Sequence, residues 1–275
     1  MIPPASEPLC ANGVRLGAIA MTPWDTEIFG FPVAQMTIES DLDVVAAAPE
    51  FAATLKAFAD ARDIALVATR IPVSKPAVVA TLCGIGFQVV DHAIEARLPR
   101  LQRCKLPTSR GDLRAATAKD LAEIERIAAS AFQFGRYHTD GKFPRALADW
   151  RYQWWVRRAF ETQSETNILF VLEMNTRVTG FFHVSVKDTL AELQLGAIDI
   201  AKEHGLLGHR LYTATITELQ TRGLREVTAQ SSATNTGVLN LYAELGFRFA
   251  HPEVILHWHA KRISNETASA ADRTL

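Results

Sequence analysis

The stretch that decides the fold lies near the end of the chain and reads SSATNTGVLNLYAELGFRF, residues 231–249. An alternating run at residues 226–230 precedes it and predicts a strand. Asn235 can cap a helix, Gly246 can end it in a left-handed conformation, and Phe247 opens the next strand. The apolar positions of this helix are Val238, Leu239, Leu241, Tyr242 and Leu245. The stretch therefore predicts a strand–helix–strand unit.

The same order of elements occurs earlier in the chain. Residues 64–71 predict a buried strand, residues 74–83 a helix and residues 88–98 a second strand, with Gly86 and Phe87 between the helix and the last strand. This copy lacks the Asn cap and the Tyr, so no chemistry is assigned to it. We interpret the first hundred residues as a degenerate copy of the C-terminal half, and chance similarity between two α/β units is the alternative.

The composition indicates a soluble protein with one large or two modest domains. The chain has 275 residues, 48% of them hydrophobic and 21% charged. A basic, Pro-containing linker at residues 99–110 predicts domains at 1–108 and 109–263, and residues 264–275 predict a disordered tail. The net charge of −1 argues against a nucleic-acid or membrane-surface partner.

Cysteine usage and hydropathy narrow the protein class further. Cys10, Cys83 and Cys104 show no paired spacing and no Cys-His cluster, so we expect no disulfide framework and no metal. The sequence has no signal-peptide pattern and no apolar run long enough to span a bilayer. We expect a cytoplasmic protein, and the sequence leaves a homodimer open.

A second informative block covers residues 192–211. A strand leads into a Gly-containing turn with Gly205 and Gly208, and a helix follows. The N-terminus of a helix exposes N–H donors that bind phosphate, and glycines let a diphosphate approach the backbone. An ordinary helix start with a turn glycine is the alternative reading.

The two blocks, in this order, resemble the Gcn5-related N-acetyltransferase superfamily over residues 113–259. The resemblance implies an α/β fold with a mixed central sheet flanked by helices, a degenerate N-terminal half and acetyl-coenzyme A as co-substrate. It departs from the family pattern at Glu203, where Arg or Gln is usual, and at Leu206, where Gly is usual. The cofactor-binding residues it implies are Ile198, Asp199, Ile200, Glu203, His204, Gly205, Leu206, Leu207, Gly208, His209, Asn235 and Tyr242.

The resemblance also implies acyl transfer from a thioester to an amine. Such a reaction needs an oxyanion stabiliser, a base and an acid for the departing thiolate. The resemblance assigns the backbone N–H of Ile198 to the thioester carbonyl and the acid role to Tyr242, with a core tyrosine that completes the helix face as the alternative for Tyr242. Glu192 is the expected water-linked base, with a solvated strand Glu as the alternative. His183 on the adjacent strand could serve as the base instead and is also a predicted substrate contact, with a core histidine as the alternative.

The acceptor is expected to be a primary amine. Trp24-Asp25, the Phe29-Gly30-Phe31-Pro32 turn and the Arg136-Tyr137-His138 loop look most like nucleotide-sugar amine acetyltransferases such as TDP-fucosamine acetyltransferases. That likeness implies substrate contacts by Arg136, Tyr137 and His138, since Arg pairs with phosphate and Tyr can stack. A peptide N-terminal amine is the rival acceptor. A non-catalytic module that binds coenzyme A or a partner chain is the rival from another class.

Overall fold

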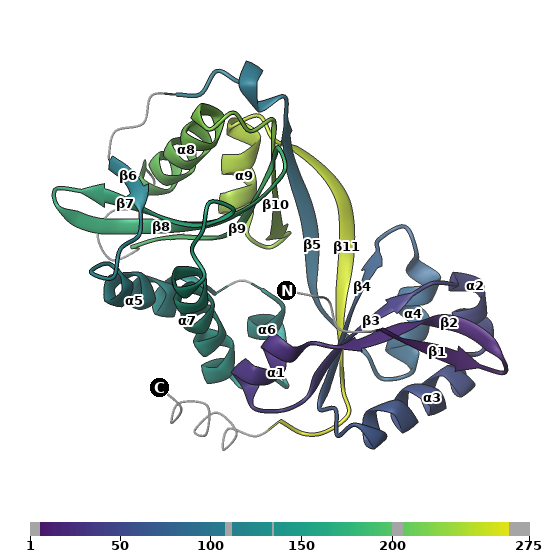
Figure 1. The fold of residues 1–275 in the computed structure, drawn as a ribbon. Coiled ribbons are helices and arrows are strands. Elements are labelled where there is room, and N and C mark those ends of the chain that lie inside the picture. The colour runs from purple at the N-terminus through teal and green to yellow at the C-terminus, as the bar shows by residue number, and fades with distance from the viewer. Residues whose placement is uncertain (1–5, 108–111, 134, 200–205, 264–275) are drawn as a thin grey trace. The chain divides into compact units, whose positions relative to one another are not determined.

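A computed structural model describes residues 6–107, 112–133, 135–199 and 206–263. The fold is mixed α/β, with a mixed sheet flanked by helices (Figure 1). The chain divides into two compact units. Unit 1 comprises residues 1–93, 135–148 and 252–275, and unit 2 comprises residues 94–134 and 149–251. The predicted tail at residues 264–275 lies outside the described residues.

Unit 1 is built on a sheet with the order β1-β2-β3-β4-β11-β5. Its elements are β1 (Glu7–Ala11), β2 (Val14–Met21), α1 (Pro23–Phe29), β3 (Val33–Ile38), α2 (Asp41–Ala46), α3 (Ala48–Ala61), β4 (Leu66–Pro72), α4 (Pro76–Gly84), α6 (Arg136–Thr139) and parts of β5 (Gln88–Pro99) and β11 (Arg248–His259). Strands β3 and β4 are parallel, whereas β1–β2, β2–β3 and β4–β11 are antiparallel. Its core includes Phe51, Leu82 and Phe87.

Unit 2 carries a sheet with the order β5-β10-β9-β8-β7-β6. Its elements are the 3₁₀ turn η1 (Leu101–Arg103), β6 (Asp112–Ala115), α5 (Leu121–Ala131), most of α7 (Arg145–Glu161), β7 (Asn167–Met174), β8 (Arg177–Lys187), β9 (Leu190–Ile198), α8 (Leu206–Thr221), β10 (Glu226–Ser232) and α9 (Thr236–Glu244). One core, around Phe182, includes α8 and α9, and a second core, around Phe181, includes α5 and α7. The sheet of unit 2 is therefore covered on both faces.

The strand–helix–strand unit predicted at residues 226–249 is confirmed. The side chain of Asn235 caps α9 by accepting a hydrogen bond from the N–H of Val238 at 3.3 Å. Gly246 has φ +86°, a left-handed conformation that costs glycine little because it lacks a Cβ. The N–H of Phe247 then bonds the carbonyl of Tyr242 at 2.9 Å and closes the helix end.

The internal repeat is also confirmed. The series β4–α4–β5 recurs as β10–α9–β11 at a constant offset of 160 residues, with starts at 66, 76 and 88 and at 226, 236 and 248. The glycines that end the two helices, Gly86 and Gly246, both have positive φ, +103° and +86°. Two segments with few identities thus adopt the same local structure because they share the apolar spacing and the glycine stop.

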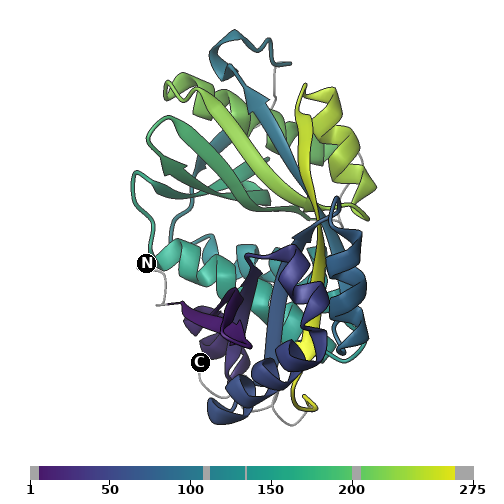
Figure 2. The same cartoon turned by 90° about the vertical axis from the view of Figure 1, so that its right-hand side faces the viewer.

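The compact units differ from the contiguous domains predicted from the linker. Their division falls within β5, at residues 93 and 94, and unit 1 also takes residues 135–148 and 252–275. The reason is the placement of the two long strands. In the sheet order, β11 lies beside β4 and β5 lies beside β10, and β5 and β11 run side by side in both views (Figures 1 and 2). Thus β5, which follows α4, does not pair with β4, and β11, which follows α9, does not pair with β10.

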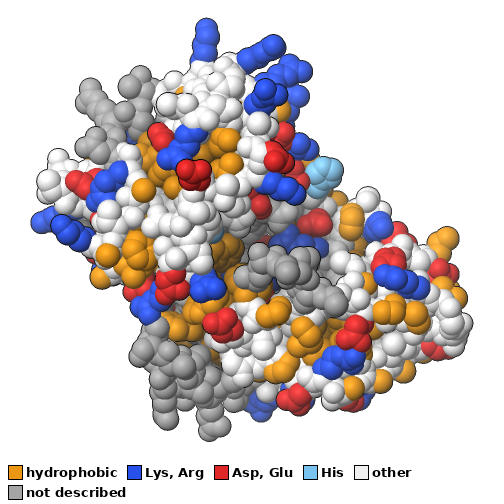
Figure 3. All heavy atoms as spheres, in the orientation of Figure 1, with side chains coloured by type: hydrophobic (Ala, Val, Ile, Leu, Met, Phe, Trp, Pro, Cys, Tyr) orange, Lys and Arg blue, Asp and Glu red, His pale blue; other side chains and the backbone are white. Residues whose placement is uncertain are grey.

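The surface agrees with the small net charge. On the face shown in Figure 3, acidic and basic side chains are interspersed. Among the described residues, no helix is both long and apolar enough to cross a membrane.

Replacing Gly86 by Ala should destabilise the protein by about 1–2 kcal/mol, because an L-residue with a Cβ is strained at this φ. Gly84→Ala is the matched control, since Gly84 lies in α4 and an added Cβ there meets no atom within 4 Å. The control should gain about 0.5–1 kcal/mol from reduced backbone entropy of the unfolded chain. Urea denaturation of both variants measures the difference, and equal stabilities would contradict the argument.

Candidate functional site

The candidate site lies in unit 2, where β9 and β10 stop pairing. Their parallel ladder runs from Leu190 opposite Glu226 to Leu193 opposite Ala229 and goes no further, although both strands continue. Just past this point β9 has a bulge. On the β8 side, Val184 pairs with Leu193 and His183 with Leu195, so Gln194 is an extra residue. A bulge increases the local twist of a strand, so the ends of β9 and β10 diverge.

A cavity of about 440 Å³ opens beside the diverging strands. We call it the β9–β10 cavity. It is lined from the end of α5, the end of β9, the first turns of α8, and the cap and body of α9. Apolar side chains such as Phe132, Val238 and Leu241 share the lining with polar ones such as Asn235 and Asn240. An apolar cleft with a few polar groups is typical of small-molecule sites.

Glycines shape the walls of this cavity. A Cβ at Gly208 or at Gly237 would meet no atom within 4 Å, so backbone there is open to a ligand. At Gly196, in contrast, there is no room for a side chain, since a Cβ would lie 2.7 Å from the ring of Phe182. Only glycine therefore fits at position 196 with Phe182 in place.

A pair of buried tyrosines lies at one wall. Tyr212 of α8 lines the cavity, and its ring centroid lies 5.4 Å from that of Tyr242. Each phenol perturbs the pKa of the other. Tyr242 is 3% exposed and packs on Phe247, 4.7 Å between centroids. Burial raises the pKa of Tyr212 to about 12 and that of Tyr242 well above its usual value, so both phenols stay protonated at neutral pH.

Solved structures with this arrangement point to one fold. The chain is similar to a GCN5-related N-acetyltransferase from Sphaerobacter thermophilus (TM-score 0.64, 13% identity, covering 91% of this chain and 78% of that chain). It is also similar to one from Kribbella flavida (TM-score 0.58, 13% identity, covering 92% and 89%). A tandem GNAT protein from the clavulanic acid biosynthesis pathway matches with a TM-score of 0.56 and 13% identity, covering 96% of this chain and 86% of that chain.

The fold is that of the GCN5-related N-acetyltransferases. Neither a family model nor a curated protein matches the sequence, so the fold rests on the structural neighbours. The mixed sheet flanked by helices and the two repeated halves agree with the predicted fold class.

Several residues predicted to bind the cofactor lie at the cavity of this acetyltransferase fold. Ile198, Gly208, His209 and Asn235 line it. Nδ1 of His209 lies 3.4 Å from the hydroxyl of Thr213, one turn along α8. The structure thus brings together the end of β9, the start of α8 and the cap of α9.

Other predicted cofactor residues lie elsewhere. Leu207 is buried in the core at 3% exposure. Asp199 is 1% exposed, and its carboxylate accepts a hydrogen bond from the Arg126 guanidinium at 2.6 Å. Ile200, Glu203, His204 and Gly205 lie outside the described residues, and so does the side chain of Leu206, where α8 begins. Their predicted contacts with a diphosphate stay predictions.

The two strand residues with predicted chemical roles differ in environment. Glu192 is exposed and lies in the paired part of β9, opposite Ser185 of β8 and Thr228 of β10. His183 is 7% exposed, and both ring nitrogens are bonded, Nδ1 by the Trp155 indole N–H at 3.1 Å and Nε2 to the Asn167 side-chain oxygen at 2.6 Å. Because Nδ1 accepts, Nε2 carries the proton. Burial lowers the pKa of His183 to about 4.

The predicted acceptor loop belongs to unit 1. Tyr137 is 3% exposed and packs on Phe29 and Phe143, with ring centroids 5.0 and 4.9 Å away. Its hydroxyl donates to Asp25 at 3.1 Å and accepts from Arg136 at 2.9 Å. His138 follows on the same short helix, α6. The predicted substrate roles of these three residues stay predictions.

Sequence reasoning missed Tyr212, Asn240 and Phe132, which all line the cavity. Tyr212 sits in an apolar stretch of α8 and Asn240 in the middle of α9, with no motif around them. The face of each helix that meets the cavity follows from tertiary packing and not from local spacing.

Replacing Gly196 by Ala should destabilise the protein by about 1–3 kcal/mol, because the new Cβ would displace the packed ring of Phe182. Gly208→Ala lines the same cavity but adds its methyl group to open space, so it should not be destabilising. Thermal unfolding of the two variants measures the effect. A stable Gly196→Ala variant would contradict the packing argument.

The stability of the protein should fall in acid partly through His183. Its folded pKa of about 4 lies below the unfolded value of about 6.5, so the unfolded state binds more protons between these values. The contribution is fully present above pH 6.5 and is lost, by about 3 kcal/mol at most, as the pH falls to 4. Urea titrations from pH 7 to 4 should show a shallower loss for His183→Gln than for wild type. His92→Gln on the exposed surface should retain the wild-type slope, and equal slopes in all three would contradict the assignment.

Proposed function

We propose that the chain is an acetyl-coenzyme A-dependent N-acetyltransferase whose acyl donor binds in the β9–β10 cavity. The observation that carries this proposal is the divergence of β9 and β10 after the Gln194 bulge, which opens onto a cavity beside the start of α8. The acetyltransferase fold of the neighbours supports it.

The cavity fits an extended thioester in three respects. Gly208 and Gly237 leave backbone exposed along its wall. The first turn of α8 points backbone N–H donors outward, which suits a diphosphate. Ile198 lies on β9 beyond the last residue that pairs with β10, so its N–H is our proposed donor to the thioester carbonyl.

The tyrosine pair is our proposed source of the proton for the leaving thiolate. In acyl transfer, the amine nitrogen bonds to the carbonyl carbon, the carbon–sulfur bond breaks, the sulfur takes a proton and the amine loses one. Tyr212 is the phenol at the cavity, and Tyr242, whose ring centroid lies 5.4 Å from that of Tyr212, is the proposed second proton donor behind it. Tyr242 thus keeps the acid role proposed from the sequence, with Tyr212 as the group that faces the sulfur.

Our more specific proposal for the acceptor is the amine of a nucleotide-linked amino sugar. It rests on the sequence resemblance at Trp24-Asp25 and Arg136-Tyr137-His138. Glu192, exposed on β9, is the proposed water-linked base that accepts the proton from the amine.

Two linked measurements test the proposed function. Calorimetry with acetyl-coenzyme A should show one site per chain, and a thiol-release assay should show turnover with one class among amino nucleotide sugars, simple amines and peptides. Release with peptides alone would replace the nucleotide-sugar acceptor. Binding without release from any class would favour a non-catalytic coenzyme A module, and no binding would overturn the proposal.

Replacing Tyr212 by Phe should lower the turnover number by about 10²–10⁴-fold, the range expected for loss of a general acid. Tyr242→Phe should lower it less, because the phenol at the cavity remains. Both variants should bind acetyl-coenzyme A nearly as wild type, which calorimetry checks. A Tyr242→Phe loss larger than that of Tyr212→Phe would make Tyr242 the direct acid, and unchanged turnover in both would remove the pair from catalysis.

A further inference from the structure

Three ligand-type side chains converge in unit 1, next to Tyr137, whose ring centroid lies 5.3 Å from that of His257. They are Asp140, His257 and His259, which we call the His-Asp trio. Oδ2 of Asp140 lies 2.7 Å from Nδ1 of His257 and 2.8 Å from Nε2 of His259. The side chains of Asp140 and His257 are fully buried, and that of His259 is 6% exposed. Three strong metal ligands thus point at one place inside the protein.

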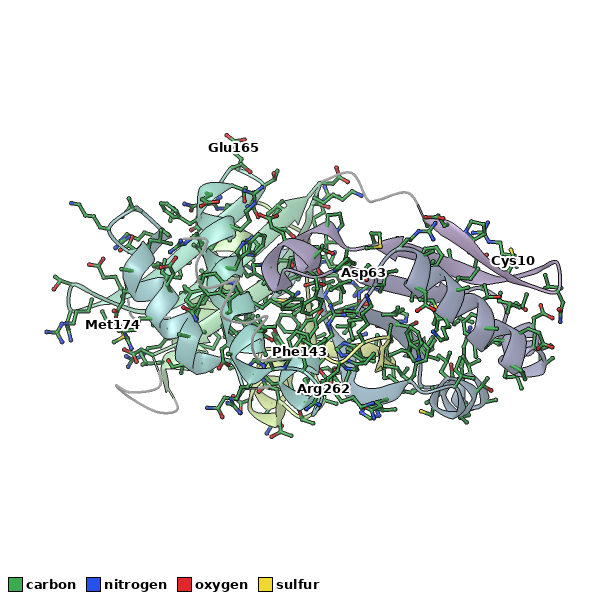
Figure 4. All side chains as sticks on the ribbon, turned by 90° about the horizontal axis from the view of Figure 1, so that it is seen from below. Cys10, Asp63, Phe143, Glu165, Met174 and Arg262 are labelled. Atoms are coloured by element: carbon green, nitrogen blue, oxygen red, sulfur yellow. The ribbon has the colours of Figure 1, made fainter. Side chains whose placement is uncertain are left out.

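The local structure holds these side chains in position. His257 and His259 are two residues apart on β11, so both project from the same face of the strand. Asp140 ends α6 and starts a turn, in which its Oδ1 accepts from the N–H of Lys142 at 3.0 Å and its carbonyl from the N–H of Phe143 at 3.0 Å. Phe143, labelled in Figure 4, closes this turn with a buried ring. One carboxylate oxygen is therefore fixed by the backbone, and the other faces the two imidazoles.

Hydrogen bonding alone does not complete this cluster. A single oxygen, Oδ2, serves both imidazoles, each of which places its proton toward Asp140. The outer nitrogens, Nε2 of His257 and Nδ1 of His259, are then buried lone pairs that no donor among the described residues reaches. Buried polar atoms are nearly always hydrogen-bonded, so this cluster is unusual for a protein core, and its main feature is the convergence of three ligand atoms.

We propose that the His-Asp trio binds a divalent transition-metal ion, with Zn²⁺ as the best match. Two imidazole nitrogens and one carboxylate oxygen form a common zinc ligand set, and a water can take the fourth position. The inner nitrogens give their lone pairs to the ion, and each imidazole moves its proton to the outer nitrogen. In a tetrahedral site the ligand atoms lie roughly 3.3 Å apart, so the distance from Oδ2 of Asp140 to each imidazole nitrogen would increase by about 0.5 Å when the ion enters.

The sequence separation agrees with this assignment. Asp140 lies 117 residues from His257 and 119 residues from His259 along the chain, so an ion would link the turn after α6 to β11 within unit 1. A link that closes so long a loop stabilises the folded state.

The test uses the full chain, freed of metal with a chelator and dialysed. Calorimetry should show one equivalent of Zn²⁺ bound, and Co²⁺ should give the visible absorption bands of a four-coordinate site with nitrogen and oxygen ligands. His259→Asn and Asp140→Asn should each lose affinity at least tenfold and abolish the bands. His251→Asn, on the exposed part of the same strand, is the matched control and should bind as wild type.

Thermal unfolding keeps the proposal testable if a variant folds poorly. Saturating Zn²⁺ should raise the midpoint of wild type and of His251→Asn but not of the two trio variants. Absence of Co²⁺ bands in wild type would overturn the proposal, whatever the variants do. So would retained binding in both trio variants, or thiolate-to-cobalt charge-transfer bands, which would place the ion on the exposed Cys10 or Cys83. None of these readouts depends on acetyl-coenzyme A, so the result is independent of the proposed function.

Discussion

The pairing of two long strands, β5 and β11, with strands from the opposite repeat is the constraint on which both units depend. In unit 1, residues 253–259 of β11 pair antiparallel with residues 66–72 of β4. In unit 2, β5 takes the corresponding place beside β10, and the side chain of Arg97 in β5 forms an ion pair with the carboxylate of Glu226 in β10. Without these partners, β4 and β10 would each be an edge with unpaired N–H and C=O groups. Neither sheet is therefore complete in a contiguous half of the sequence, and each needs a strand that arrives from far along the chain.

The two repeats share a scaffold but not its polar residues. The cap position held by Asn235 in the second copy is Lys75 in the first, which makes no side-chain cap and pairs with Asp41. The position of Tyr242 corresponds to Leu82, a fully buried residue of the unit 1 core. The glycine stop, in contrast, is kept in both because the backbone needs its positive φ. The features required by the backbone persist in both copies, whereas Asn235 and Tyr242, which the proposed chemistry uses, have counterparts of another type in the first copy.

The range over which each feature is determined explains which parts of the structure the sequence could predict. Caps, glycine stops and apolar periods act over a few residues, so α9, its cap and the repeat were predictable. The exchange of β5 and β11 between the two repeats was not predictable, because the local sequence does not determine which neighbouring strand a strand pairs with. For the same reason the sequence could not show that Tyr137 is buried beside Phe29 and Phe143. His257 and His259 form a visible His-x-His pattern on a strand, but their third partner, Asp140, is 117 residues away from His257. A three-residue cluster whose third residue lies far away along the chain can be recognised only from the three-dimensional structure.

Burial of the tyrosine pair bears directly on whether it can act as an acid. A phenol with a pKa of about 12 is a poor donor to a solvated thiolate, whose conjugate acid has a pKa near 8.5. The proposed leaving group forms in the same cavity, however, and desolvation raises the pKa of a thiol as it raises that of a phenol. Desolvation in the cavity therefore makes the phenol a weaker acid and also makes the leaving thiolate a stronger base. Tyr212 and Tyr242, being protonated throughout the neutral range, hold a proton ready at the wall of the cavity, and its transfer becomes favourable only as charge develops on the sulfur.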